Sequence, residues 1–119
     1  MRVYVAGKYS DNNVMSIFDN MRRGIRAATA VFVQGMSPFC PWLDYHYCLQ
    51  TLESTKLTVE QFYKYSMDWL EVSDVMYVLD GYETSKGTLA EIERAKELNI
   101  PIVYNFYDLM KFKTEFEAR

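Results

Sequence analysis

Residues 75–104 read VMYVLDGYETSKGTLAEIERAKELNIPIVY, and this stretch decides the fold. An uninterrupted apolar run at 75–79 predicts a strand covered on both faces, and a polar loop follows it. Helical spacing of apolar residues then predicts a helix from Gly87 to about Leu98, and residues 101–104 predict another buried strand. A strand, a helix and a strand in this order predict two parallel strands joined by a helical crossover.

The same alternation begins at the N-terminus. Residues 2–7, RVYVAG, predict a buried strand that stops at a tight turn. Apolar side chains between 14 and 32 then recur at steps of three and four, which predicts one helix. Asp11 or Asn12 can cap the start of this helix, and Gly35 ends it.

The middle of the chain is less regular. Residues 36–40 predict a short strand near a sheet edge, because Pro38 has no N–H to donate. The aromatic stretch 41–56 shows no clean period and predicts a loop with one helical turn. Residues 58–61 have the spacing of a capping box and predict the start of the next helix, and residues 106–117 predict the last one.

Four successive strand–helix units predict one three-layer α/β domain over residues 1–119. We expect a flavodoxin-like (Rossmann-like) parallel sheet of four or five strands with helices on both faces. The strands at 2–7 and 75–79 should be adjacent at its centre. Ligands bind outside the carboxyl ends of parallel strands. The loops at 7–12 and 80–87 and the stretch after residue 40 should therefore form the site.

Composition excludes several classes of protein. The 119 residues include 16 acidic and 13 basic side chains, for a net charge of −3, which does not favour a nucleic-acid duplex as partner. No apolar run approaches the roughly 18 residues of a membrane span. The two cysteines form neither a metal motif nor a disulfide framework, so we expect no metal and a cytoplasmic location. An aromatic content of 16% predicts a homo-oligomer, at least a dimer.

Known phosphate and cofactor motifs are absent. A dinucleotide-binding fold needs G-x-G-x-x-G after its first strand, and Gly7-Lys8-Tyr9-Ser10 does not supply it. A P-loop is also missing, and Ala6-Gly7 lacks the acidic cluster of a phosphoacceptor receiver domain. We therefore expect no cofactor.

Glu91 lies inside the apolar arc of the helix that begins at Gly87. A carboxylate on the buried side of a helix is costly unless it caps a group, forms a pair or has a function. The alternative interpretation is an acid near the first turn that offsets the helix dipole. Just upstream, Ser85-Lys86-Gly87-Thr88 combines hydroxyls, a cation and free backbone N–H groups, which suits a phosphate, although such a serine can also be only an N-cap.

Three other polar residues have ordinary interpretations as well. Tyr4 fits a core ring whose hydroxyl has found a polar partner. Asp68 fits a solvated helix residue. His46, the one histidine, fits an incidental loop residue, although its loop could cover a bound base.

Together these segments resemble a known family. Gly7 after a Tyr-bearing strand, Asp68-Trp69-Leu70 before Ser73-Asp74-Val75, and GYETSKGTLAE at 81–91 resemble the nucleoside 2-deoxyribosyltransferase-like superfamily. Its members include deoxyribosyltransferases, 2′-deoxynucleoside 5′-phosphate N-hydrolases and small phage or bacterial proteins.

The resemblance implies cleavage of the N-glycosidic bond of a 2′-deoxynucleoside or, preferably, its 5′-monophosphate, by hydrolysis or deoxyribosyl transfer. Glu91 would be the nucleophile, Tyr4 would orient its carboxylate, and Asp68 would assist at the sugar or the departing base. The expected phosphate-binding residues are Gly7, Lys8, Ser85, Gly87 and Thr88, and the expected base-pocket residues are Trp42 and His46. The alternative is a non-catalytic nucleotide-binding or sensing protein of the same fold.

Overall fold

The computed structural model describes all residues from Met1 to Arg119. Its strands and helices, in chain order, are β1 (Arg2–Ala6), α1 (Val14–Val33), β2 (Ser37–Phe39), α2 (Tyr45–Gln50), α3 (Val59–Leu70), β3 (Val75–Val78), α4 (Lys86–Glu97), β4 (Ile102–Val103) and α5 (Phe106–Glu117). Short 3₁₀ helices, η1 (Pro41–Asp44) and η2 (Tyr82–Thr84), precede α2 and α4. No helix combines the length and the apolar character needed to cross a membrane.

The four strands form one parallel sheet in the order β2-β1-β3-β4. The β1–β3 pair lies at its centre, with Val3 opposite Val75 and Ala6 opposite Val78. This order confirms the predicted flavodoxin-like α/β class and the predicted adjacency of the first strand and the 75–79 strand. It also brings the loops after β1 and β3 to the same edge of the sheet.

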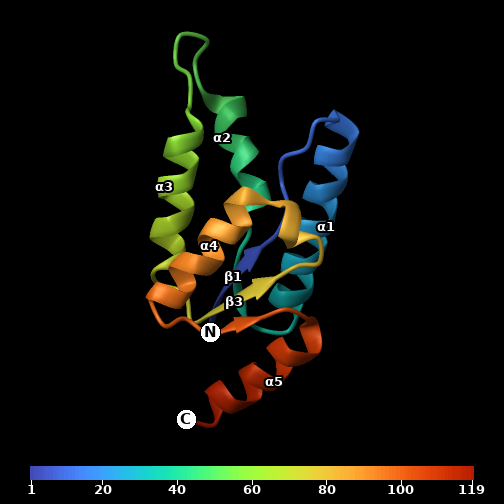
Figure 1. Ribbon diagram of the computed structural model, residues 1–119, viewed down its shortest axis with the longest axis vertical. Coiled ribbons are helices and arrows are strands. Elements are labelled where there is room, and N and C mark those ends of the chain that lie inside the picture. The colour runs from blue at the N-terminus through green and yellow to red at the C-terminus, as the bar shows by residue number, and fades with distance from the viewer.

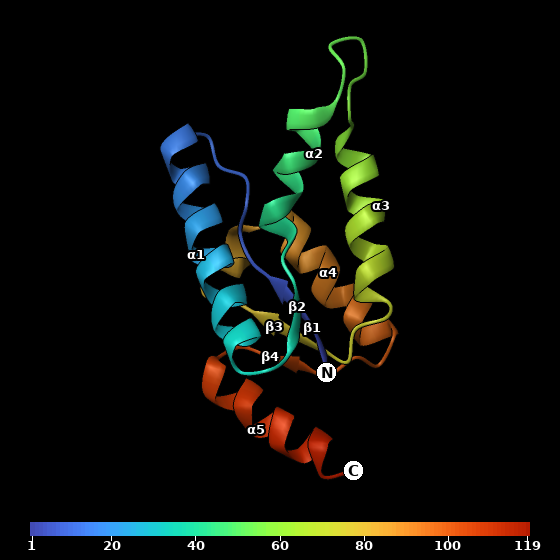
Figure 2. The same cartoon turned by 180° about the vertical axis from the view of Figure 1, so that it is seen from behind.

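The central strands divide their side chains between two cores. Val3 and Val5 point into a cluster with Val31 and Leu109 from α1 and α5. The intervening residues, including Tyr4, point into a second cluster with residues of α3 and α4. Figures 1 and 2 show the resulting layers, with α1 on one side of the sheet and α3 and α4 on the other. The period of two along a strand therefore aims Tyr4 at α4.

Helix caps agree with the sequence at α3 and differ at α1. The Thr58 hydroxyl accepts the Gln61 N–H, and the Gln61 side chain accepts the Thr58 N–H, which confirms the capping box. The prediction that Asp11 or Asn12 caps α1 was wrong. Asn13 is the cap, and its Oδ1 accepts the Met15 N–H at 2.8 Å, because α1 begins only at Val14.

The stretch expected to be a loop contains more helix than predicted. Residues 41–50 form η1 and α2, and α2 runs beside α3 as part of a projection that extends beyond the sheet (Figures 1 and 2). Pro41 starts η1, where its fixed φ is already suitable for a helix and its missing N–H costs nothing. Contacts with α3 help to hold α2, as where the Tyr47 and Tyr65 hydroxyls lie 3.4 Å apart. Such contacts leave no periodic signal in the sequence.

Candidate active site

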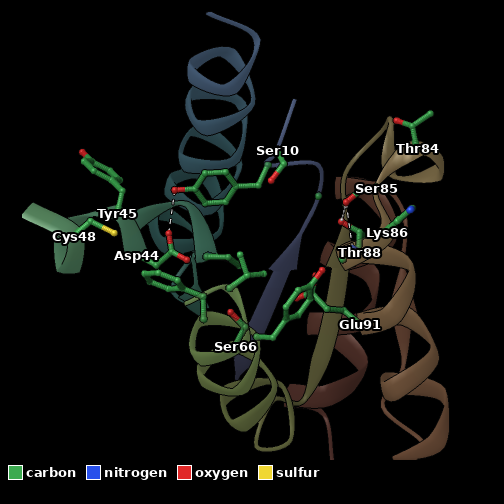
Figure 3. Close-up of a pocket in the computed structure, with 17 residues that line it drawn as sticks. Ser10, Asp44, Tyr45, Cys48, Ser66, Thr84, Ser85, Lys86, Thr88 and Glu91 are labelled. Carbon is green, nitrogen blue, oxygen red and sulfur yellow. Dashed lines mark hydrogen bonds between the residues drawn. The ribbon is translucent and has the colours of Figure 1, made fainter. Parts of the chain in front are cut away.

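A cavity of about 550 Å³ lies at the carboxyl-terminal edge of the sheet, in the size range of small-molecule sites. The loop after β1, the η1–α2 segment, α3 and the N-terminal half of α4 form its walls (Figure 3). All three loop regions expected from the sequence therefore contribute to it.

Glu91 lies in this cavity and is only 9% exposed. The hydroxyl of Tyr4, which is itself fully buried, donates a hydrogen bond to Glu91 Oε2. Burial raises the pKa of Glu91 to about 8. The hydrogen bond from Tyr4 acts in the opposite direction, because it favours the charged carboxylate. Glu91 is thus a fixed carboxyl group with one oxygen held by Tyr4 and a pKa close to neutrality, as is common for groups that react.

The start of α4 forms the wall next to Glu91. The Ser85 hydroxyl accepts the Thr88 N–H at 3.2 Å and lies 2.8 Å from the Thr88 hydroxyl, so Ser85 is the N-cap of this helix. A Cβ on Gly87 would lie 2.8 Å from the Tyr63 hydroxyl oxygen, so only glycine fits between the two helices without a shift. Lys86, a cationic residue, also lines the cavity. This wall combines N–H groups, hydroxyls and a cation, which suits an anion.

A second carboxyl group lines the cavity from η1. Asp44 is half-buried, and its Oδ1 accepts a hydrogen bond from the Tyr9 hydroxyl at 3.0 Å. Burial raises the pKa of Asp44, and the Tyr9 hydrogen bond partly opposes the rise. Burial and the neighbouring Asp44 charge raise the pKa of Tyr9 above its ordinary value, so the phenol stays a donor. In Figure 3, Asp44 and Glu91 face the cavity from opposite sides.

Half of the ten residues expected at the site line the cavity. Gly7, Ser85, Gly87, Thr88 and Glu91 line the cavity. Tyr4 lies beneath the cavity and contacts it through Glu91.

Core packing also favours a glycine at position 7. A Cβ there would lie 3.1 Å from the Trp42 ring and 3.3 Å from Leu79 Cβ, so its small size permits core packing.

Lys8 is not brought to the cavity lining. Its ammonium pairs with Asp11 at 3.4 Å within the loop after β1. Lys86 is the lysine that lines the cavity, because it occupies the first turn of α4. Of these two lysines, only Lys86 lines the cavity.

Asp68 is also outside the cavity. Its carboxylate is exposed and pairs with Lys64 at 2.8 Å on the outer face of α3. Ser66 lines the cavity instead. Two residues correspond to about 200° around a helix, so α3 cannot present both side chains to the same wall. Asp68 therefore does not lie where the resemblance implied, beside the substrate.

The two expected base-pocket residues have other positions. Trp42 is 1% exposed in the core, packs against Gly24 and donates its indole N–H to the Lys8 carbonyl at 3.1 Å. His46 is exposed and stacks on Tyr45, with ring centroids 4.2 Å apart. Neither lines the cavity, where Tyr45 provides the aromatic surface on this side.

Sequence reasoning missed Tyr9, Asp44 and Ser66. Ser66 has a detectable signal, because it shares the inner face of α3 with Leu70, one turn away. Asp44 and Tyr9 have none, since the sheet topology alone brings their loops together. No group of three or more His, Cys, Asp or Glu side chains is arranged to hold a metal ion.

Comparison with known proteins supports the fold. A 2-deoxyribosyltransferase from the psychrotolerant bacterium Bacillus psychrosaccharolyticus has a similar structure, with a TM-score of 0.63 at 16% sequence identity. The similarity covers 90% of this chain and 79% of that one. No curated protein matches the sequence. A family model described as a domain of unknown function, DUF7768, matches residues 1–105, and the chain therefore belongs to that family.

Proposed function

We propose that this protein cleaves the N-glycosidic bond of a 2′-deoxynucleoside, preferably as its 5′-monophosphate, with Glu91 as the nucleophile. The observation that supports this most is the Tyr4–Glu91 pair in the cavity, beside an anion-suited helix start. The resemblance of the 81–91 segment to the deoxyribosyltransferase-like superfamily and the fold shared with a 2-deoxyribosyltransferase point the same way.

The proposed reaction has two steps. The Glu91 carboxylate oxygen that is free of Tyr4 attacks the anomeric carbon, and the carbon–nitrogen bond breaks with its electron pair leaving on the base, which then takes up a proton. Water, or the nitrogen of a second base, next attacks the glycosyl ester and releases Glu91. Tyr4 fixes the carboxylate and limits the reorganisation required during attack.

The anion-suited wall supports the preference for a monophosphate. Ser85, Lys86 and Gly87 precede Glu91 by less than two turns at the start of α4, so a phosphate bound there would place the attached sugar near the carboxylate. The strongest charge in the substrate and the reacting carbon would then be bound by the same helix.

Base release tests the proposal directly. Each of the four deoxynucleosides and its 5′-monophosphate is incubated with the protein, with and without a second free base, and the products are separated by chromatography. We expect Glu91→Gln to lower release by several orders of magnitude, because charge stabilisation is commonly the largest catalytic contribution. Glu93→Gln, an exposed neutralisation on the same helix, is the control. Release by Glu91→Gln within about twofold of the parent would remove Glu91 from catalysis.

One observation favours the non-catalytic alternative. The residue expected to act as the second carboxylate, Asp68, lies outside the cavity, and Ser66 faces it instead. A nucleotide-binding protein would bind the same monophosphates without releasing base. The substrate panel distinguishes the two functions when binding is measured alongside turnover.

We also propose that the protein is at least a homodimer. The projection formed by α2, α3 and the loop between them exposes Leu49, Leu52 and Val59, which are 67%, 75% and 66% accessible. Apolar side chains gathered on one projecting element are typical of a protein contact. Light scattering at micromolar concentration should give at least twice the mass of one chain, and the mass of one chain would contradict the proposal.

A further inference from the structure

The place of the base in the cavity can be inferred from the expected places of the phosphate and of the anomeric carbon. The anion-suited start of α4 is on one side, and Glu91 lies about one and a half turns further along the same helix. A nucleotide with its phosphate at α4 and its anomeric carbon at Glu91 must extend its base toward the opposite wall. In Figure 3 that wall contains Asp44 and Tyr45.

Asp44 has free capacity to accept hydrogen bonds at this wall. Tyr9 donates to Oδ1, and Asp44 forms no ion pair with any lysine, arginine or histidine. A carboxylate has about four lone-pair sites, so both oxygens keep accepting capacity. A partly buried acceptor without a cation is costly unless a ligand supplies donors.

The remaining wall suits a flat ring. Tyr45, Phe62 and Tyr63 line the cavity, and aromatic side chains bind bases by stacking without selecting among them. Selection therefore depends on the polar group at the edge of the base, as in enzymes that read the Watson–Crick edge of an unpaired base.

We propose that Asp44, held by Tyr9, selects the base and that it selects guanine. This inference rests on the proposed function. Guanine presents two adjacent N–H donors, at N1 and at the 2-amino group, which match the two oxygens of one carboxylate. Adenine and cytosine place an acceptor nitrogen beside their amino group, and thymine has carbonyl oxygens on both sides of its N–H. Each of these acceptors would face a carboxylate oxygen and be repelled.

The test uses a pair of substrates that differ by one group. 2′-Deoxyguanosine and 2′-deoxyinosine 5′-monophosphates differ only in the 2-amino group, which donates one of the two hydrogen bonds. A hydrogen bond to a charged group is worth about 1.5–3 kcal/mol, so we expect kcat/KM to favour the guanine substrate by roughly 10- to 100-fold. Asp44→Asn keeps the shape and should reduce this ratio to within about threefold.

The same variant should improve use of adenine relative to guanine, because a carboxamide offers one donor and one acceptor. Tyr9→Phe should lower the guanine preference less, since the carboxylate remains but is no longer held. Asp19→Asn, an exposed acid paired with Arg22 on α1, is the matched control and should leave the ratio unchanged.

Binding separates this inference from the proposed function. If no base is released from any substrate, the proposed function is wrong, and calorimetric binding of the two monophosphates still measures the effect of Asp44. Equal affinities for the guanine and hypoxanthine nucleotides would then refute the selection. If base is released without preference, or if Asp44→Asn keeps the preference, Asp44 does not select the base although Glu91 retains its role.

Discussion

Replacing Glu91 with glutamine should stabilise the protein at high pH and leave its stability nearly unchanged at low pH. The folded chain holds a proton on Glu91 up to a pKa of about 8, whereas an unfolded chain releases it near the ordinary value of 4.5. Between these values the folded state binds more protons than the unfolded state, so rising pH destabilises the fold through this group. Glutamine stays neutral throughout and can still accept the Tyr4 hydrogen bond.

The size of the effect follows from the two pKa values. One pKa unit corresponds to about 1.4 kcal/mol, so a change from 4.5 to about 8 gives an upper bound of roughly 5 kcal/mol. The hydrogen bond from Tyr4 stabilises the charged form and reduces the effect. We therefore expect the variant to gain about 2–4 kcal/mol over the parent at pH 9, and much less at pH 5.

Urea unfolding followed by circular dichroism at several pH values from 5 to 9 measures this difference. The free energy of unfolding of the variant minus that of the parent should rise with pH and level off above pH 8. Other titrating groups contribute equally to the unfolding free energy of both proteins, so their contributions cancel in this difference. Glu93→Gln, on the exposed face of α4, should give a difference that stays within about 0.5 kcal/mol. A flat difference for Glu91→Gln, or one that falls with pH, would refute the burial argument.

Three other outcomes are expected. Base release should rise with pH through an apparent pKa near 8 in kcat/KM, since a nucleophilic Glu91 must lose its proton, and a fall through the same range would make it an acid instead. Ser85→Ala should lower kcat/KM for monophosphates by roughly 10- to 100-fold relative to nucleosides. It should also lower the free energy of unfolding by about 1 kcal/mol, because the N-cap of α4 is lost. Equal effects on both substrates would mean that Ser85 is only a helix cap. Gly24→Ala should destabilise the fold by about 1–3 kcal/mol in thermal unfolding, because its Cβ would lie 2.1 Å from the Trp42 ring, whereas Arg26→Ala on the exposed face of α1 should have little effect.

The candidate site was predictable where it depends on one element. Glu91 could be placed on the inner face of α4 because the residue and its apolar neighbours share one helical period. Ser85 could be placed at the start of the same helix because cap residues have a local signature. The local interpretation of Asp68, a solvated helix residue, agrees with its exposed ion pair with Lys64. The resemblance implied a place beside the substrate instead, and Ser66, about 200° away around α3, lines the cavity.

The sequence by itself determined the strand–helix alternation, the parallel sheet with β1 and β3 at its centre, and the inward position of Glu91. These features depend on periodicity and on handedness, which act over a few residues. The tertiary structure alone decided that Tyr9 holds Asp44 and that both lie across a cavity from Glu91. It also decided that Trp42 fills the core beneath Gly7 and that Lys86, and not Lys8, lines the cavity. The physical reason is that such contacts join loops far apart in the chain, where the order of the strands sets the distance and no local spacing encodes it.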